Sequence, residues 1–255
     1  MSIVARSFSS GVLDGQGLFL SLHSPLFSRY VRVLIMKYYP IFLDLRTYPC
    51  LVIGGGTVAE RKVQSLLQAH GQVTVISPTC THQLRSWATD RAITLYERSY
   101  RSGDLQGFSV AFAATNDEAL HEKIAAEARA AGVLLNVVDR PALCSFILPA
   151  IVSQGDLTLA ISTGGASPAL AKKVRQTLEQ HFGPEYDLAL RLLARVRERV
   201  VRDGLSADER QQIFTTLANS PLLDYLRERQ TDKLDALLQE TVGESCTLED
   251  LGFSL

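Results

Sequence analysis

Three consecutive glycines, Gly54, Gly55 and Gly56, stand between a short apolar run and a helix-like segment in the stretch CLVIGGGTVAERK. Gly54, Gly56 and Ala59 satisfy the pattern G-x-G-x-x-A. In that pattern the first glycine permits a tight turn and the second lets a pyrophosphate approach the backbone. The small third residue lets the helix pack closely on the strand. Because a strand pattern precedes the loop and a helix pattern follows it, we predict a dinucleotide cradle rather than a turn that binds nothing.

The second predicted strand lacks the acidic residue that usually holds the adenosine ribose. The stretch VTVISPT ends in Ser77, Pro78 and Thr79, and no acidic residue follows before Asp90. Arg85 lies well inside the next segment, so no basic residue is placed for a 2′-phosphate either. We therefore expect Ser77, Thr79 or backbone groups to contact the ribose, and charge does not decide between NAD and NADP.

A second chemical candidate is Asp139, in the stretch NVVDRPALCSFILPA. It stands at the carboxyl end of a predicted parallel strand, which is the edge at which open α/β sheets bind their ligands. A carboxylate in that place can act as a general acid or base. The alternative is a structural aspartate that caps the turn before Arg140 and Pro141.

A third candidate is the stretch STGGASP, a Gly-rich loop before a helix. Ser167 is a natural N-cap, with Pro168 at the first helical position. The backbone N–H groups of this loop and of the helix N-terminus suit a carboxylate, and the residues that offer them are Thr163, Gly164 and Gly165. The helix also carries three basic residues, which add positive charge unless they only form a solvated face: Lys172, Lys173 and Arg175.

Strand and helix patterns alternate in the part of the chain that must position these groups. Short apolar or β-branched runs predict strands at residues 50–55, 73–77, 93–97, 108–115 and 133–139. Helical spacing predicts helices at 57–70, 79–90 and 116–131, the last with a capping box formed by Thr115 and Glu118. This alternation implies right-handed βαβ crossovers and a parallel sheet covered on both faces.

The pattern changes after Pro141. Residues 145–152 and 156–162 predict two extended segments joined by a turn, and a helix is predicted from Pro168. Residues 185–241 are helical in pattern, with a capping box at Ser206 and Glu209. The predicted fold class is α/β: a Rossmann-like parallel sheet, a short β dimerisation segment and an all-helical C-terminal region. The predicted boundaries are 36–144 for the dinucleotide-binding domain, 145–166 for the β connector and 167–255 for the helical dimerisation and substrate domain.

Residues 1–35 differ from the rest, with one acidic residue, Asp14, and three arginines among many serines. Charged residues and a proline interrupt the apolar part, so we expect neither a membrane span nor a secretory signal. An organelle-targeting leader is one interpretation. We favour a disordered or non-native extension, because Met36 opens a plausible natural start.

The overall composition argues against several classes of protein. Lys+Arg 26 and Asp+Glu 27 give a formal net charge of -1, so no global field points to nucleic acid or to a membrane surface. No CxxC pair is formed by the four cysteines, Cys50, Cys80, Cys144 and Cys246. We expect buried thiols in a reducing, cytoplasmic compartment. No metal-ligand spacing is shared by His70, His82, His121 and His181. We expect each to be a surface or cap residue and predict no protein-held metal.

Four motifs follow one another along the chain: PIFLDLRTYPCLVIGGGTVAERK, AFAATND, NVVDRPALCSFILPA and ISTGGASPALAKKVR. In this order and spacing they resemble the precorrin-2 dehydrogenase family. This family forms the amino-terminal module of siroheme synthase, and in yeast it is a bifunctional dehydrogenase and ferrochelatase. The resemblance runs from about Tyr38 to about Val200.

The resemblance implies NAD-dependent oxidation of the tetrapyrrole precorrin-2 to sirohydrochlorin by a homodimer. Some family members then insert ferrous iron to form siroheme, so iron or cobalt insertion stays open. The resemblance assigns catalysis to Asp139. The predicted cofactor-binding residues are Gly54, Gly55, Gly56, Thr57, Val58, Ser77, Pro78, Thr79 and Thr115. The predicted substrate-binding residues are Asn136, Arg140, Thr163, Gly164, Gly165 and Ser167.

Two other functions stay open from the residues alone. One is a non-catalytic, NAD-sensing Rossmann regulatory domain, and the other is a different NAD(P) oxidoreductase. A sensor keeps the glycine loop and usually the acidic ribose anchor, but it does not need NVVD and TGGASP together.

Overall fold

The computed structural model describes residues 37–255. The extension expected at residues 1–35 lies outside the described residues, and the domain boundaries given above stay predictions.

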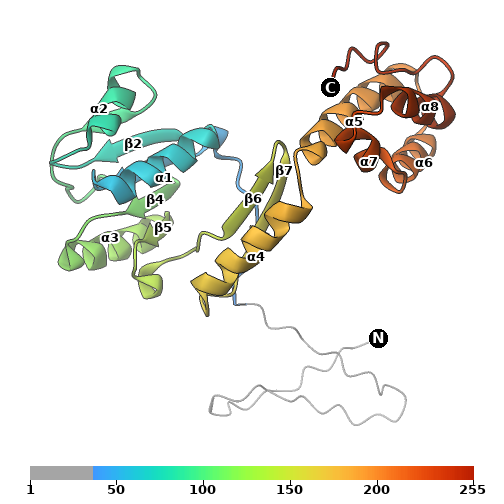
Figure 1. Ribbon diagram of the computed structural model, residues 1–255. Coiled ribbons are helices and arrows are strands. Elements are labelled where there is room, and N and C mark those ends of the chain that lie inside the picture. Colours follow the sequence, from blue (N-terminus) through green and yellow to red (C-terminus); the bar gives the residue numbers. More distant parts are fainter. Residues whose placement is uncertain (1–36) are drawn as a thin grey trace, which may run out of the picture. The chain divides into compact units, whose positions relative to one another are not determined.

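Five parallel strands form one sheet in the order β3-β2-β1-β4-β5 (Figure 1). Their bounds are β1 Pro49–Ile53, β2 Gln72–Ile76, β3 Thr94–Tyr96, β4 Val110–Ala113 and β5 Leu134–Val137. A short 3-10 helix, η1 (Leu45–Thr47), precedes β1. The central strands β1 and β4 are apolar and almost wholly buried, as expected for strands covered on both sides. The predicted parallel sheet is confirmed.

Helices cover both faces of this sheet because successive residues of each strand point to opposite sides. Cys50 and Val52 of β1 pack with helices α1 and α2, whereas Leu51 and Ile53 pack with helix α3. The helices are α1 (Thr57–Gln68), α2 (His82–Thr89) and α3 (Glu118–Ala131).

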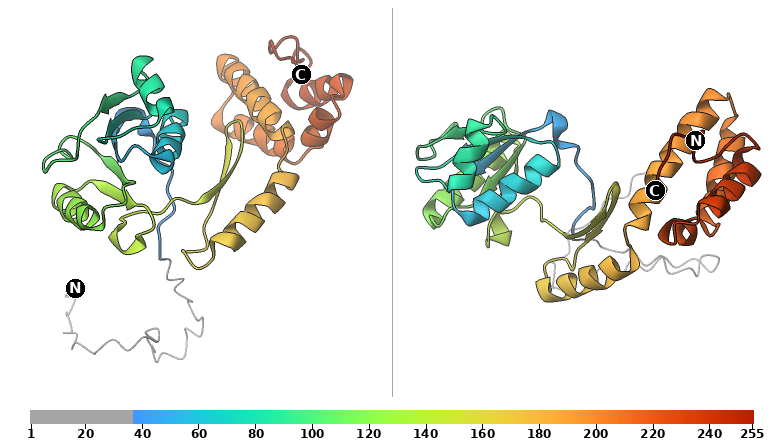
Figure 2. Two further views of the ribbon diagram at one scale, coloured as in Figure 1. Left: turned by 60° about the vertical axis from the view of Figure 1, so that its left-hand side comes forward. Right: turned by 45° about the horizontal axis from the view of Figure 1, so that its top comes forward.

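The first extended segment of this region begins later than predicted. Strands β6 (Ala150–Gln154) and β7 (Leu157–Ile161) form an antiparallel pair beside helix α4 (Pro168–His181), as Figure 2 shows. A 3-10 helix, η2 (Pro141–Leu143), and an irregular stretch precede β6. This stretch does not extend the strand because it bonds back to β5: the Ser145 hydroxyl accepts a hydrogen bond from the Leu135 N–H at 2.7 Å.

The C-terminal part is all-helical, as predicted. Its helices are α5 (Glu185–Arg202), α6 (Ala207–Ala218), α7 (Leu222–Arg227) and α8 (Thr231–Val242). They enclose a separate core of fully buried side chains, among them Leu192, Val196, Leu217, Leu234 and Leu238. The capping box predicted at Ser206 and Glu209 is confirmed.

Two cysteines, Cys50 and Cys246, are buried as predicted, whereas Cys80 and Cys144 are only half-buried, and all four are free thiols. Burial raises the pKa of the Cys50 thiol to about 11. Across residues 37–255, no helix combines the length and the hydropathy that a membrane span requires.

Candidate dinucleotide and substrate site

Three adjacent strands end at the same edge of the sheet, and a predicted site residue follows each of them. Strand β1 pairs with β4, and β4 pairs with β5, all in parallel. Gly54 follows β1, Thr115 follows β4, and Asp139 follows β5. The chain runs from β1 outward to β2 and β3, then resumes at β4 on the other side of β1. The strand order therefore reverses between β1 and β4, and open α/β sheets bind ligands in the crevice at such a point.

The glycine loop packs tightly on two neighbours and leaves its third glycine open. Gly54 has φ +123°, which glycine adopts without strain. A Cβ atom at Gly54 would lie 2.2 Å from the carbonyl oxygen of Ala114, and one at Gly55 would lie 2.1 Å from that of Thr79. A Cβ atom at Gly56 would meet nothing within 4 Å. Gly54 and Gly55 therefore close the loop against the protein, whereas Gly56 borders space that a ligand can enter.

Helix α1 begins with N–H donors that no side chain caps. Its N-cap is Gly56, which has no side chain to accept a hydrogen bond. The first-turn N–H groups of Thr57, Val58 and Ala59 have no acceptor inside the helix. Such N–H groups at the positive end of the helix dipole bind anions well. The uncapped terminus and the open surface at Gly56 thus fit the pyrophosphate of a dinucleotide.

The turn after β2 carries the residues predicted to contact the ribose. Ser77 is buried, and its hydroxyl donates to the carbonyl oxygen of Thr79 at 2.7 Å. Pro78 and Thr79 are exposed. Arg85 pairs with Glu97 at 2.9 Å, and this hydrogen bond raises the Arg85 pKa. Ser77 therefore shapes the turn, Arg85 is already paired, and the ribose contacts stay a prediction.

Thr115 does not cap helix α3, so the capping box predicted from Thr115 and Glu118 is wrong. Asp117 is the N-cap, because it directly precedes the first helical residue and its carboxylate accepts a hydrogen bond from the Leu120 N–H at 3.0 Å. The Thr115 hydroxyl instead accepts a hydrogen bond from the Asp117 N–H at 3.3 Å. It also bonds Nε2 of His121 at 3.1 Å. Its contact with the cofactor stays a prediction.

His121 is only 4% exposed, so the prediction of a surface or cap residue is wrong for this histidine. Its Nδ1 is buried and has no hydrogen-bond partner among residues 37–255. The sequence contains a signal for this burial that is separate from metal-ligand spacing. His121 stands at helical spacing from Ile124, Ala125 and Ala128, which form the buried face of α3.

Asp139 has φ +58° and an exposed side chain. This left-handed conformation is uncommon for residues other than glycine, and aspartate tolerates it better than most. Lys62 of helix α1 lies within electrostatic range of this carboxylate. Burial lowers the Lys62 pKa, Arg61 lowers it further, and Asp139 opposes both effects. The turn after β5 thus presents a carboxylate to solvent near helix α1.

Two residues predicted to bind substrate make hydrogen bonds or ion pairs around this turn. The Arg140 guanidinium pairs with Glu118 of helix α3 at 2.8 Å. The Asn136 amide donates to the carbonyl oxygen of Phe146 at 3.1 Å. These bonds hold the segments on either side of Asp139, and direct contact with substrate stays a prediction for both residues.

The Gly-rich loop before helix α4 is organised by its own hydroxyl groups. The Thr163 hydroxyl accepts from the Ser167 N–H at 3.2 Å and donates to the Ser167 carbonyl at 3.1 Å. The Ser167 hydroxyl accepts from the Leu170 N–H at 3.1 Å, so the predicted N-cap is confirmed. A Cβ atom at Gly164 or Gly165 would meet nothing within 4 Å. The role of the loop in binding carboxylates stays a prediction.

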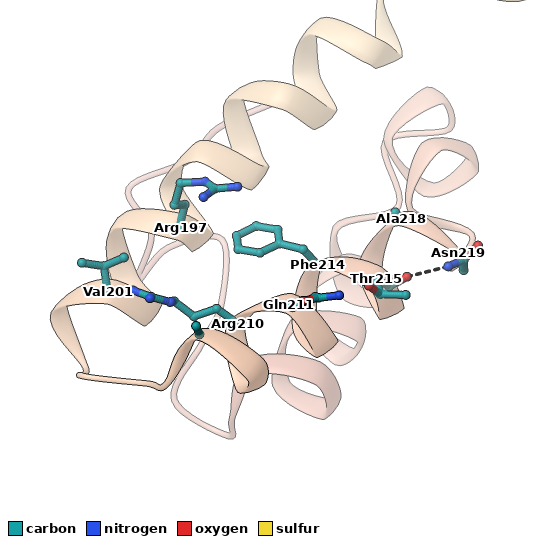
Figure 3. Close-up of a pocket in the computed structure, with 9 residues that line it drawn as sticks. Arg197, Val201, Arg210, Gln211, Phe214, Thr215, Ala218 and Asn219 are labelled. Carbon is teal, nitrogen blue, oxygen red and sulfur yellow. Dashed lines mark hydrogen bonds between the residues drawn. The ribbon is translucent and has the colours of Figure 1, made fainter. Parts of the chain in front are cut away.

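A cavity of about 710 Å³ lies among helical residues outside the predicted site (Figure 3). Arg197 from α5 lies over the ring of Phe214 from α6, with its guanidinium carbon 4.7 Å from the ring centroid. The wall also includes Val201, Arg210 and Gln211. None of the sequence-predicted site residues lines this cavity.

No group of three or more His, Cys, Asp or Glu side chains within residues 37–255 is arranged to hold a metal ion. The reversal of strand order, the open glycine and the uncapped helix together define an NAD(P)-binding Rossmann domain.

Comparison with known proteins agrees with this class. Residues 41–150 match the family "Putative NAD(P)-binding", and residues 154–181 match the family "Sirohaem biosynthesis protein central". Siroheme synthase of Nitrosococcus oceani is 43% identical over 169 residues, covering 65% of this chain and 36% of that protein. Siroheme synthase of Methylococcus capsulatus is 36% identical over 214 residues, covering 84% of this chain and 45% of that protein.

A solved structure described as SirC, precorrin-2 dehydrogenase, superposes with a TM-score of 0.66 at 26% identity. The match covers 80% of this chain and 99% of that one. This chain spans less than half the length of the siroheme synthases it matches. Both matched families stand in this order along the chain, and together with these relatives they agree with the resemblance that the four sequence motifs carry.

Proposed function

We propose that this protein oxidises precorrin-2 to sirohydrochlorin with NAD as the hydride acceptor. The observation that carries the proposal is the carboxyl edge of β1, β4 and β5. There an uncapped helix N-terminus follows β1 and an exposed carboxylate, Asp139, follows β5, and both of these strands pair with β4. The likeness to a precorrin-2 dehydrogenase structure and to siroheme synthases supports the same reaction.

The glycine loop would hold the cofactor. The N–H groups of Thr57 and Val58 would bind the pyrophosphate, with Gly56 leaving room for its approach. The turn of Ser77, Pro78 and Thr79 would receive the adenosine ribose through hydroxyl and backbone groups. When bound, the nicotinamide ring would accept the hydride.

Asp139 would accept the proton. Oxidation of precorrin-2 to sirohydrochlorin removes two hydrogens, one as hydride and one as a proton, so the site needs a base. The Asp139 carboxylate is exposed at the ligand-binding edge, and its left-handed backbone fixes the direction of the turn. A positioned carboxylate of this kind contributes about 10²- to 10⁴-fold to a rate.

The loop of residues 163–167 would bind substrate carboxylates. Precorrin-2 carries many acetate and propionate groups, which suit backbone N–H groups and arginine or lysine side chains better than an apolar pocket. Thr163 and Ser167 hold the loop in shape, and the Gly164 N–H donates to the Ser162 hydroxyl at 3.1 Å. A Cβ atom added at Gly165 would meet no atom of the described residues within 4 Å.

We further propose that a second copy of the chain covers strands β6 and β7 and helix α4. Leu148, Ile151 and Leu170 are 47%, 52% and 54% exposed, and α4 buries only Ala171. Light scattering during gel filtration tests this proposal, and a monomer at micromolar concentration would contradict it.

Incubation with precorrin-2 and NAD tests the proposed reaction. We expect the absorption spectrum of sirohydrochlorin and one NADH per product, both lost in the Asp139→Asn variant. Saturable NAD binding with no oxidation would favour the sensor, and oxidation of other substrates only would favour a different oxidoreductase. Ferrous or cobaltous ion added afterwards tests metal insertion, with the metal as substrate.

A further inference from the structure

His121 is the buried polar side chain that the proposed reaction leaves without a role. It is 4% exposed on the sheet-facing side of helix α3. Its Nε2 lies 3.1 Å from the Thr115 hydroxyl, and its buried Nδ1 has no hydrogen-bond partner in the part of the chain that the structure describes. Burying an unpaired polar atom is unfavourable, so a leucine here would pack with less penalty. Stability therefore does not explain why this place holds a histidine.

Thr115 stands where a bound dinucleotide would pass. It follows β4 at the point where the strand order reverses. A Cβ atom added to Gly54 would lie 3.4 Å from the backbone nitrogen of Thr115. The backbone of Thr115 therefore lies next to the glycine loop, and the Thr115 residue is half-buried.

The hydrogen bonds around the Thr115 hydroxyl determine what it can offer a ligand. A hydroxyl has two lone pairs and one proton. The Asp117 N–H occupies one lone pair at 3.3 Å. If His121 carries its proton on Nε2, that N–H occupies the second lone pair, and the unpaired Nδ1 is a bare acceptor rather than a stranded donor. The hydroxyl proton then has no acceptor in the described part of the chain and can be donated to a ligand.

We propose that His121 is a positioning residue that turns the Thr115 hydroxyl into a fixed donor toward the bound dinucleotide. The acceptor is an oxygen of the dinucleotide, either a ribose hydroxyl or the nicotinamide carboxamide. This inference rests on the proposed binding of NAD, but not on the identity of the substrate.

A double-mutant cycle on NAD affinity tests the coupling between the two residues. Removing the donor in Thr115→Val is expected to raise the Kd for NAD about tenfold. His121→Leu is expected to raise it by a similar factor, while the melting temperature stays the same or rises. His121→Gln should restore most of the affinity, because its amide nitrogen can replace Nε2. In the double variant the loss should not exceed that of Thr115→Val alone.

The control is His181→Leu, the same exchange at an exposed histidine outside residues 41–150. An NAD affinity of His121→Leu equal to that of the wild type would overturn the proposal. So would an equal further loss in the Thr115→Val background, or a fall in melting temperature that His121→Gln does not repair. A wild-type protein that binds NAD but leaves precorrin-2 unchanged refutes only the proposed reaction, because the cycle is measured on binding.

Discussion

The two exchanges Gly55→Ala and Gly56→Ala should separate folding from cofactor binding within one loop. A methyl group at Gly55 would lie 2.1 Å from the carbonyl oxygen of Thr79 and 2.8 Å from both Cys80 Sγ and Ser77 Oγ. The loop cannot accept it without moving, and overpacking of this kind costs about 1–3 kcal/mol. For a chain of this size that corresponds to a fall in melting temperature of roughly 2–12 °C.

Gly56→Ala should behave in the opposite way. Gly56 has φ -84° and ψ -175°, which alanine adopts easily, and its added methyl would meet no atom within 4 Å. The variant should fold as stably as the wild type, or gain about 0.4–1 kcal/mol because the unfolded chain is less flexible. Its methyl would occupy the space in which the pyrophosphate approaches. Loss of one hydrogen bond to a charged group costs about 1.5–3 kcal/mol, or about 10- to 150-fold in the Kd for NAD.

Thermal unfolding without NAD and calorimetric titration with NAD measure the two effects on the same preparations. Gly55→Ala should lose stability, and Gly56→Ala should lose NAD affinity while keeping its stability. Wild-type NAD affinity in Gly56→Ala would refute the assignment of this loop as a pyrophosphate cradle. An unchanged melting temperature in Gly55→Ala would refute the packing argument.

Three further outcomes are expected. Asp139→Asn should keep the left-handed turn and the Kd for NAD but lower kcat for precorrin-2 at least about 100-fold. Undiminished turnover would show that Asp139 is not the general base. Burial would raise the Glu185 pKa, but the hydrogen bonds from Arg227 and from backbone N–H groups outweigh it, so the pKa lies below its ordinary value of 4.5. The ionised carboxylate therefore stabilises the fold above about pH 4.5 and loses this effect as the pH falls through its lowered pKa. Glu185→Gln should flatten that part of the curve of unfolding free energy against pH, and an identical curve would contradict the reasoning. Ser206→Ala should lower the free energy of unfolding by about 1 kcal/mol in denaturant titration, because it removes the N-cap of α6, and no change would mean that the capping box is not stabilising.

The local order of elements could be predicted because its causes lie within a few residues of one another. Helix α1 begins directly after Gly56, α4 begins after the N-cap Ser167, and α6 begins after the capping box of Ser206 and Glu209. The irregular stretch before β6 could not be predicted, since Ser145 bonds to the edge of β5 instead of extending a strand. Its apolar residues alone are compatible with either outcome.

The candidate site divides in the same way. The pattern G-x-G-x-x-A and the position of Asp139 after a strand depend on sequence spacing, so they could be read directly. The helical spacing of His121 indicates its burial, but its bond to Thr115 depends on how α3 packs beside the end of β4. The competing cap at Asp117 depends on where the helix begins.

By itself, the sequence determined the fold class, the glycine loop, the strand-end carboxylate and the family resemblance, because each depends on local residue types and their order. Only the tertiary structure decided how the three glycines divide their roles. Gly54 meets the residues directly after β4, Gly55 meets the turn after β2, and Gly56 meets open space. These neighbours are far apart in the chain, and only the packing of the sheet brings them to the loop.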